Sequence, residues 1–187
     1  MLKQRIQAPF FEVGPKAYLY GQDALELAQV AEEASLKSGV SVIYTPQLTD
    51  LALISRKVQH LYLCAQHMDA LRPGKGQGSI LPEAVRAAGA TCVMLNHAEH
   101  PMTVAALRAA IERAREVGLW SIACADSIAE AQAVAAMSPD ILVVEPSELI
   151  GTGVTSDEQL ISASTRAVKE INPEIQVLQG AGISNAD

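Results

Sequence analysis

Residues that can transfer protons or bind anions stand at or just after the ends of short apolar runs in this sequence. Lys16, His67, His97 and Glu145 are residues of this kind. A carboxylate can remove a proton, and imidazole or ammonium groups can stabilise a developing negative charge. Other polar residues and glycines follow runs in the same way: Gln66, Asn96, Asp126, Gly180 and Gly182. Any one of them could be an ordinary loop residue, but the repeated arrangement predicts a shared active face.

The apolar runs have the length of β-strands, and helical patterns lie between them. The clearest helical pattern spans residues 103–117, with Leu107, Ile111 and Ala114 on one face. Gly118 follows it, where glycine favours a helix end. The strands are continuously apolar, which indicates burial on both faces and parallel pairing. The predicted strands are residues 10–13, 41–44, 61–65, 92–96, 121–125, 141–144 and 176–178.

The repeated strand–helix units predict an α/β fold in a single domain over residues 1–187, since no linker or low-complexity stretch interrupts them. Such a repeat can form an open doubly wound sheet or a closed barrel, and periodicity does not choose between them. In a barrel, the carboxyl ends of the strands form the active face.

Composition limits the function classes. Apolar residues make up 49% of the 187 residues, and the formal net charge is −7, with no long Lys/Arg run. Nucleic acid is therefore not an expected partner. Cys64, Cys92 and Cys124 lie in apolar runs without metal-ligand spacing, which predicts buried, reduced thiols and no metal site. With no signal-peptide pattern and no membrane-spanning stretch, we expect a cytoplasmic protein without membrane contact.

Several motifs occur in one order along the chain. They are Gly14-Pro15-Lys16-Ala17-Tyr18, Ala65-Gln66-His67-Met68-Asp69, Gly76-Gln77-Gly78, Asn96-His97-Ala98-Glu99, the run from Val144 to Gly153, and Gly180-Ala181-Gly182-Ile183-Ser184. In this order they resemble the triosephosphate isomerase family, particularly its shorter archaeal branch. A lone histidine or Gly-x-Gly would be weak evidence, whereas the ordered set is specific.

The resemblance implies isomerisation of glyceraldehyde 3-phosphate and dihydroxyacetone phosphate through an enediolate, without a cofactor. The family is itself the standard example of such catalysis by a glutamate base, a neutral histidine and a closing loop. It implies that Glu145 is the base, His97 the neutral electrophile and Lys16 the cation that holds the phosphate and the developing charge. Residues 146–152 would form the lid. The remaining implied residues are Gly151, Gly180, Ala181 and Gly182 as substrate-binding N–H donors, and Asn96 and Glu99 as supporting residues, with a plain surface role left open for Glu99.

Two segments depart from the family pattern. Gly14 stands where the family has asparagine, and Ala98-Glu99-His100-Pro101 stands where many members have Ser-Glu-Arg-Arg.

The sequence ends at Asp187, shortly after the seventh run. We therefore expect a TIM (β/α)8-type barrel that lacks its last units, with seven parallel strands, closed or covered by self-association as a homo-oligomer. Two functions follow: an isomerase acting on a small phosphorylated sugar, or a catalytically inactive homologue that forms a stable barrel-like homo-oligomer.

Overall fold

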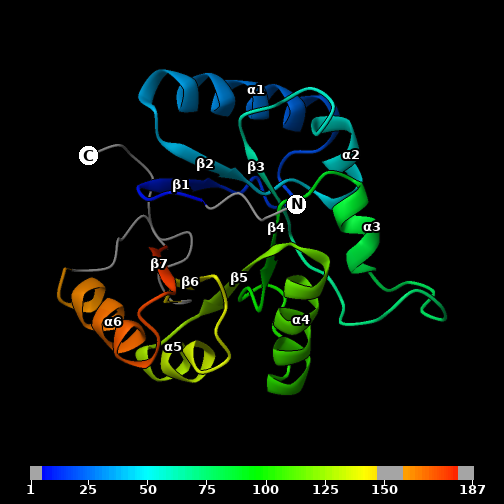
Figure 1. Cartoon of the computed structure of the whole chain (residues 1–187). Helices are drawn as coiled ribbons and strands as arrows, with labels where there is room; N and C mark the ends of the chain where they lie inside the picture. The colour runs from blue at the N-terminus through cyan, green and yellow to red at the C-terminus, as the bar shows by residue number, and fades with distance from the viewer. Residues whose placement is uncertain (1–5, 147–157, 181–187) are drawn as a thin grey trace. The chain divides into compact units, whose positions relative to one another are not determined.

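The computed structural model describes residues 6–146 and 158–180, along which strands and helices alternate as predicted (Figure 1). The strands are β1 (Phe10–Val13), β2 (Ser41–Tyr44), β3 (Tyr62–Ala65), β4 (Cys92–Leu95), β5 (Trp120–Ala125), β6 (Ile141–Val144) and β7 (Gln176–Gln179). The helices are α1 (Gly21–Ser38), α2 (Leu51–Ile54), α3 (Pro82–Ala87), α4 (Val104–Val117), α5 (Ile128–Ala135) and α6 (Glu158–Ile171), with a 3-10 helix η1 (Leu48–Asp50) before α2.

The strand order decides between the two folds that periodicity left open. All seven predicted strands are present, and the described pairings are parallel. Their order in the sheet is the order of the chain, from β1 to β7. A doubly wound sheet reverses its strand order at a switch point, whereas a β/α barrel adds each strand beside the preceding one. The fold is therefore of the TIM-barrel type, and the prediction of seven parallel strands is confirmed.

Contacts divide the described chain into two compact units. The first contains residues 6–94 and 112–120, and the second contains residues 95–111, 121–146 and 158–180. The expectation of a single domain over residues 1–187 stays a prediction.

In the first unit, α1 packs against β2 through small side chains. Ala24 and Ala28 of α1 are fully buried, as is Tyr44 at the end of β2. The Tyr44 hydroxyl donates a hydrogen bond of 2.6 Å to the backbone carbonyl of Ala24. Burial, together with the nearby Asp50 carboxylate, raises the pKa of Tyr44 to about 12. The hydroxyl thus stays protonated and continues to link strand and helix at neutral pH.

In the second unit, which includes β5 from Ser121 onwards, every residue of β5 and β6 is buried. Burial on both faces is confirmed for these two strands, whereas the prediction is wrong for β1 and β7, which have no fully buried residue. Helices α5 and α6 lie side by side in this unit (Figure 1). Ser127 begins α5 as its N-cap, since its hydroxyl accepts a hydrogen bond of 3.2 Å from the backbone N–H of Glu130. Helix α6 is joined to β7 because the Gln179 amide donates to the buried Ser164 hydroxyl at 3.1 Å.

One expectation from composition, that the cysteines are buried, is confirmed in the described residues. Cys64, Cys92 and Cys124 are all buried and none forms a disulfide. The described helices are each too short or too polar to span a bilayer.

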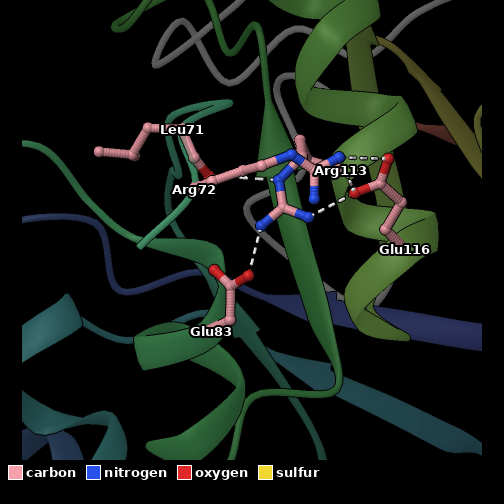
Figure 2. A network of polar contacts seen from close by, with 5 residues as sticks. All are labelled: Leu71, Arg72, Glu83, Arg113 and Glu116. Atoms are coloured by element: carbon pink, nitrogen blue, oxygen red, sulfur yellow. Dashed lines mark hydrogen bonds and ion pairs between the residues drawn. The ribbon is translucent and has the colours of Figure 1, made fainter. Parts of the chain in front are cut away.

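Arg113 of α4 lies at the centre of a polar network in the first unit, which Figure 2 shows from close by. Its side chain is only 7% exposed. The guanidinium donates to Glu83 of α3 at 2.6 Å, to Glu116 of α4 at 2.5 Å and to the backbone carbonyl of Leu71 at 3.2 Å. Arg72 also pairs with Glu116, at 2.9 Å. One guanidinium therefore joins α3, α4 and the segment that follows β3.

Hydrogen bonds from Arg113 are the main cause of the lowered pKa of both Glu83 and Glu116. A carboxyl group whose pKa is lower in the folded state stabilises the fold above its unfolded pKa, here 4.5. That contribution is lost as the pH falls from this value towards the lower folded pKa.

Replacing Arg113 with leucine should lower the midpoint of thermal unfolding at neutral pH by several degrees, because two partly buried carboxylates lose their shared donor. The difference from wild type should shrink as the pH falls below about 4.5, where both carboxylates become protonated in either protein. Circular dichroism melts over a pH series measure both effects. Arg108→Leu, at an exposed position on the same helix, is the matched control. A difference from wild type that does not change with pH would contradict this account of the network.

Candidate active site

Two of the three predicted catalytic side chains meet in the second unit. His97 lies two residues beyond β4, and Glu145 comes directly after β6. The Nε2 atom of His97 lies 3.6 Å from the Oε2 atom of Glu145, and the two side chains are 16% and 17% exposed. This distance is too long for a hydrogen bond between them. The two polar atoms are thus close together without being hydrogen-bonded to each other.

The tautomer of His97 follows from its backbone surroundings. The backbone N–H of Glu99 donates to Nδ1 of His97 at 3.1 Å, so Nδ1 must carry a lone pair. The hydrogen of a neutral imidazole is then on Nε2, the atom that faces Glu145. A tight turn, closed by the 2.8 Å bond from His100 N–H to the His97 carbonyl, holds this arrangement. In its neutral form, His97 therefore presents Nε2–H towards Glu145, and its role as the electrophile stays a prediction.

Asn96 connects this turn to the neighbouring elements. Its backbone is left-handed, with φ 58°, which asparagine tolerates better than most residues. Its side-chain amide donates to the Cys124 carbonyl of β5 at 3.0 Å and to Glu130 of α5 at 3.1 Å. Its side-chain oxygen accepts from the backbone N–H of Met102 at 2.9 Å. The geometry suits the supporting role that the sequence predicts for Asn96.

Glu145 is positioned by the strand ladder and by a glycine. Its backbone N–H donates to the Ala125 carbonyl at 2.9 Å, and Gly180 N–H donates to the Val144 carbonyl at 3.0 Å. A Cβ atom at position 180 would lie 3.3 Å from Cβ, Cγ and Cδ of Glu145. The sequence predicts Gly180 as a substrate-binding residue. The absence of a Cβ at Gly180 also leaves space for the Glu145 side chain.

Lys16 belongs to the first unit, where it follows β1. Its backbone has φ 50°, and its carbonyl accepts hydrogen bonds from the side-chain amides of Gln47 and Gln66, at 2.7 and 2.9 Å. Its side chain is half-buried.

The departure at position 14 lies beside the Glu12 side chain. A Cβ atom on Gly14 would lie 2.8 Å from Oε1 of Glu12. That oxygen accepts a hydrogen bond of 2.5 Å from the Thr45 hydroxyl. The Glu12 carboxylate therefore occupies the space beside Gly14 that a side chain there would need.

Other polar residues at strand ends have local roles. His67, after β3, has its Nε2 atom 3.6 Å from an Asp69 oxygen in the first unit. The backbone N–H of Asp126, after β5, donates to Glu130 at 3.0 Å. Within residues 6–146 and 158–180, no three His, Cys, Asp or Glu side chains gather in a way that would hold a metal ion. The absence of a cofactor stays a prediction.

Several predicted residues lie outside the described parts of the chain. They are Gly151, Ala181, Gly182 and all of the lid segment after Pro146. Their proposed roles stay predictions. Glu99 is exposed, and the contact that the structure gives it with His97 is through its backbone N–H.

Sequence reasoning missed three residues that hydrogen-bond beside predicted residues of their own unit: Glu12 and Gln47 in the first unit and Glu130 in the second. Glu130 stands three residues after Ser127, the Ser-x-x-Glu spacing of a helix start, which was an available signal. The other two have no local signal, because their partners are distant in the sequence.

Comparison with known proteins gives a consistent result. The family model described as triosephosphate isomerase matches residues 15–187. A triosephosphate isomerase from Methanocaldococcus jannaschii is 41% identical over 170 residues, covering 89% of this chain and 77% of the relative. The chain belongs to the triosephosphate isomerase family. Further relatives of that name are one from Methanoculleus marisnigri, 38% identical over 97% of this chain and 84% of its own length, and one from Methanothermobacter thermautotrophicus, 40% identical over 92% and 77%.

Gly180→Ala should lower kcat for triose-phosphate isomerisation by about 10- to 100-fold, because the new Cβ would displace the Glu145 side chain by a few tenths of an ångström or more. A coupled assay of the purified variant measures the change. Gly39→Ala is the control, since its Cβ would meet open space and only its left-handed backbone would be strained. This control should lose stability and keep its kcat. Unchanged kcat in Gly180→Ala would show that the contact does not position Glu145.

Proposed function

We propose that this chain interconverts glyceraldehyde 3-phosphate and dihydroxyacetone phosphate. The observation that carries the proposal is the pairing of His97 Nε2 and Glu145 Oε2 at 3.6 Å, with Nδ1 of His97 already occupied by the Glu99 N–H. One group can remove a proton from carbon while the other donates to an oxygen of the same substrate. Isomerising a hydroxyaldehyde to a ketone needs both.

Glu145 acts as the base in this scheme. Its carboxylate removes the proton from the carbon beside the carbonyl group, and the C–H electron pair forms the double bond of an enediolate. The resulting carboxylic acid returns the proton to the neighbouring carbon, and the hydroxyl proton passes from one enediolate oxygen to the other, so no oxidant or reductant is consumed. With the side chain only 17% exposed, few water molecules compete with the substrate for this carboxylate.

His97 stabilises the intermediate as a neutral donor. Its Nε2–H donates to the substrate oxygen on which negative charge develops, and the Glu99 N–H keeps the ring in the required tautomer. A preoriented donor does not have to reorganise when the charge forms, which is why such groups contribute strongly to rate.

Lys16 holds the phosphate group and adds positive charge, on the strength of its position after β1 within the ordered family motifs. The backbone N–H groups of Gly151, Ala181 and Gly182 complete the phosphate contacts, whereas the N–H of Gly180 already donates to the Val144 carbonyl. Residues 146–152 close over the substrate. The substrate is thus a small phosphorylated sugar.

Glu145→Gln should lower kcat by about 10²–10⁴-fold, because the amide cannot take a proton from carbon. Glu174→Gln, at an exposed position in the same unit, is the matched control and should retain full activity. A coupled isomerase assay on protein purified from a host lacking its own isomerase measures both.

The alternative is a catalytically inactive homologue. Equal trace rates in wild type, Glu145→Gln and Glu174→Gln would favour it, since activity that does not depend on Glu145 does not come from this site.

We further propose a cytoplasmic location and self-association. The three buried cysteines without disulfides are typical of a reducing compartment. Among the described strands, β1 pairs with β2 alone and β7 with β6 alone, and Phe11 of β1 is 50% exposed. Strand edges of this kind favour association with another copy.

Sedimentation velocity over a tenfold range of protein concentration should therefore give a species larger than a monomer. A single species of 19.8 kDa at all concentrations would overturn the homo-oligomer.

A further inference from the structure

Lys16 has a backbone conformation that is unfavourable for a residue with a Cβ atom. Its φ of 50° places it in the left-handed region, which is costly for a residue with a Cβ atom and which lysine has no special means to offset. A conformation of this kind persists only where the surroundings impose it. The turn around it is closed by the 3.0 Å hydrogen bond from Tyr18 N–H to the Pro15 carbonyl.

Two side-chain amides supply the constraint. Gln47 Nε2 donates to the Lys16 carbonyl at 2.7 Å, and Gln66 Nε2 donates to the same oxygen at 2.9 Å. A carbonyl oxygen has two lone pairs, and these two bonds use both. Gln66 also reaches the Thr45 carbonyl at 3.3 Å, which ties it to the segment after β2.

The two donors come from different parts of the first unit. Gln47 precedes η1 and lies 31 residues from Lys16, whereas Gln66 follows β3 and lies 50 residues away. With the preceding peptide held in the turn, rotation of Lys16 about N–Cα to a negative φ would move its carbonyl and its Cβ together. Because the carbonyl is held from two sides, the direction in which the lysine side chain leaves the backbone is held as well.

We propose that Gln47 and Gln66 are positioning residues that fix the left-handed backbone of Lys16 and thereby orient its ammonium group towards the substrate's phosphate. The expected kinetic effect rests on the proposed function. The control of the Lys16 backbone by the two amides is independent of that function.

Methionine is the substitution that tests it, because it keeps the length of glutamine and removes the donor. The double variant Gln47→Met/Gln66→Met should lower kcat/KM about 10- to 100-fold, as expected when a catalytic group is misplaced. Gln22→Met, at an exposed position of α1 in the same unit, is the matched control and should match wild type.

A double-mutant cycle with Lys16→Met separates positioning from general stability. In the Lys16→Met background, the two glutamine substitutions should change the residual kcat/KM less than about twofold, since no ammonium group remains to be oriented. Equal losses in both backgrounds would mean that the glutamines act on the fold and would overturn the proposal.

A crystal structure of Gln47→Met/Gln66→Met gives a readout that does not need activity. Lys16 should relax to a negative φ in that variant; a φ that stays near 50° would overturn the proposal even if the wild type is inactive. If the double variant does not fold, either single variant serves the same test. Absence of wild-type activity together with a relaxed Lys16 would reject the isomerase and keep the backbone constraint.

Discussion

A parallel ladder buried on both faces is the constraint on which the candidate site depends. β5 and β6 run in register from Ile122 opposite Ile141 to Ala125 opposite Val144, and both strands are buried throughout. A charged side chain within such a ladder would lose its water without gaining a partner. Glu145 can therefore stand only beyond the last buried pair, where its N–H still bonds to Ala125. The apolar strands and the reactive strand ends are two results of one constraint.

The two units use the same local device next to a reactive group. Asn96 and Lys16 both have left-handed backbones, with φ 58° and 50°. In each unit, hydrogen bonds of side-chain amides hold the turn: Asn96 uses its own amide, whereas Lys16 receives those of Gln47 and Gln66. A turn held in this way has little freedom to drift, and the side chain it carries is oriented before any substrate arrives.

The strands are predictable from the sequence because a run of apolar residues directly indicates a buried segment. Their polar ends are predictable because the first polar residue after such a run marks where the burial stops. The partners that hold the polar residues are not, because they come from distant segments: Gln47 is 31 residues from Lys16, and Glu130 is 34 residues from Asn96. Arg113 is a similar case. Charged neighbours on α4 make it resemble a solvent-facing residue, and its partner Glu83 is 30 residues away. The family resemblance suggests the role of each site residue, whereas only the structure shows which hydrogen-bond partners orient it.

The Arg113 network has a consequence for the order of events during synthesis. Arg113 lies 42 residues after Leu71 and 30 after Glu83. Ribosomes add roughly 5–20 residues per second, so Leu71 and Glu83 are synthesised seconds before Arg113. In that interval, the Leu71 carbonyl and the Glu83 carboxylate lack the donor that Arg113 later supplies. The first unit also includes residues 112–120, so it cannot be completed by its N-terminal stretch and must wait for the end of α4 to be made.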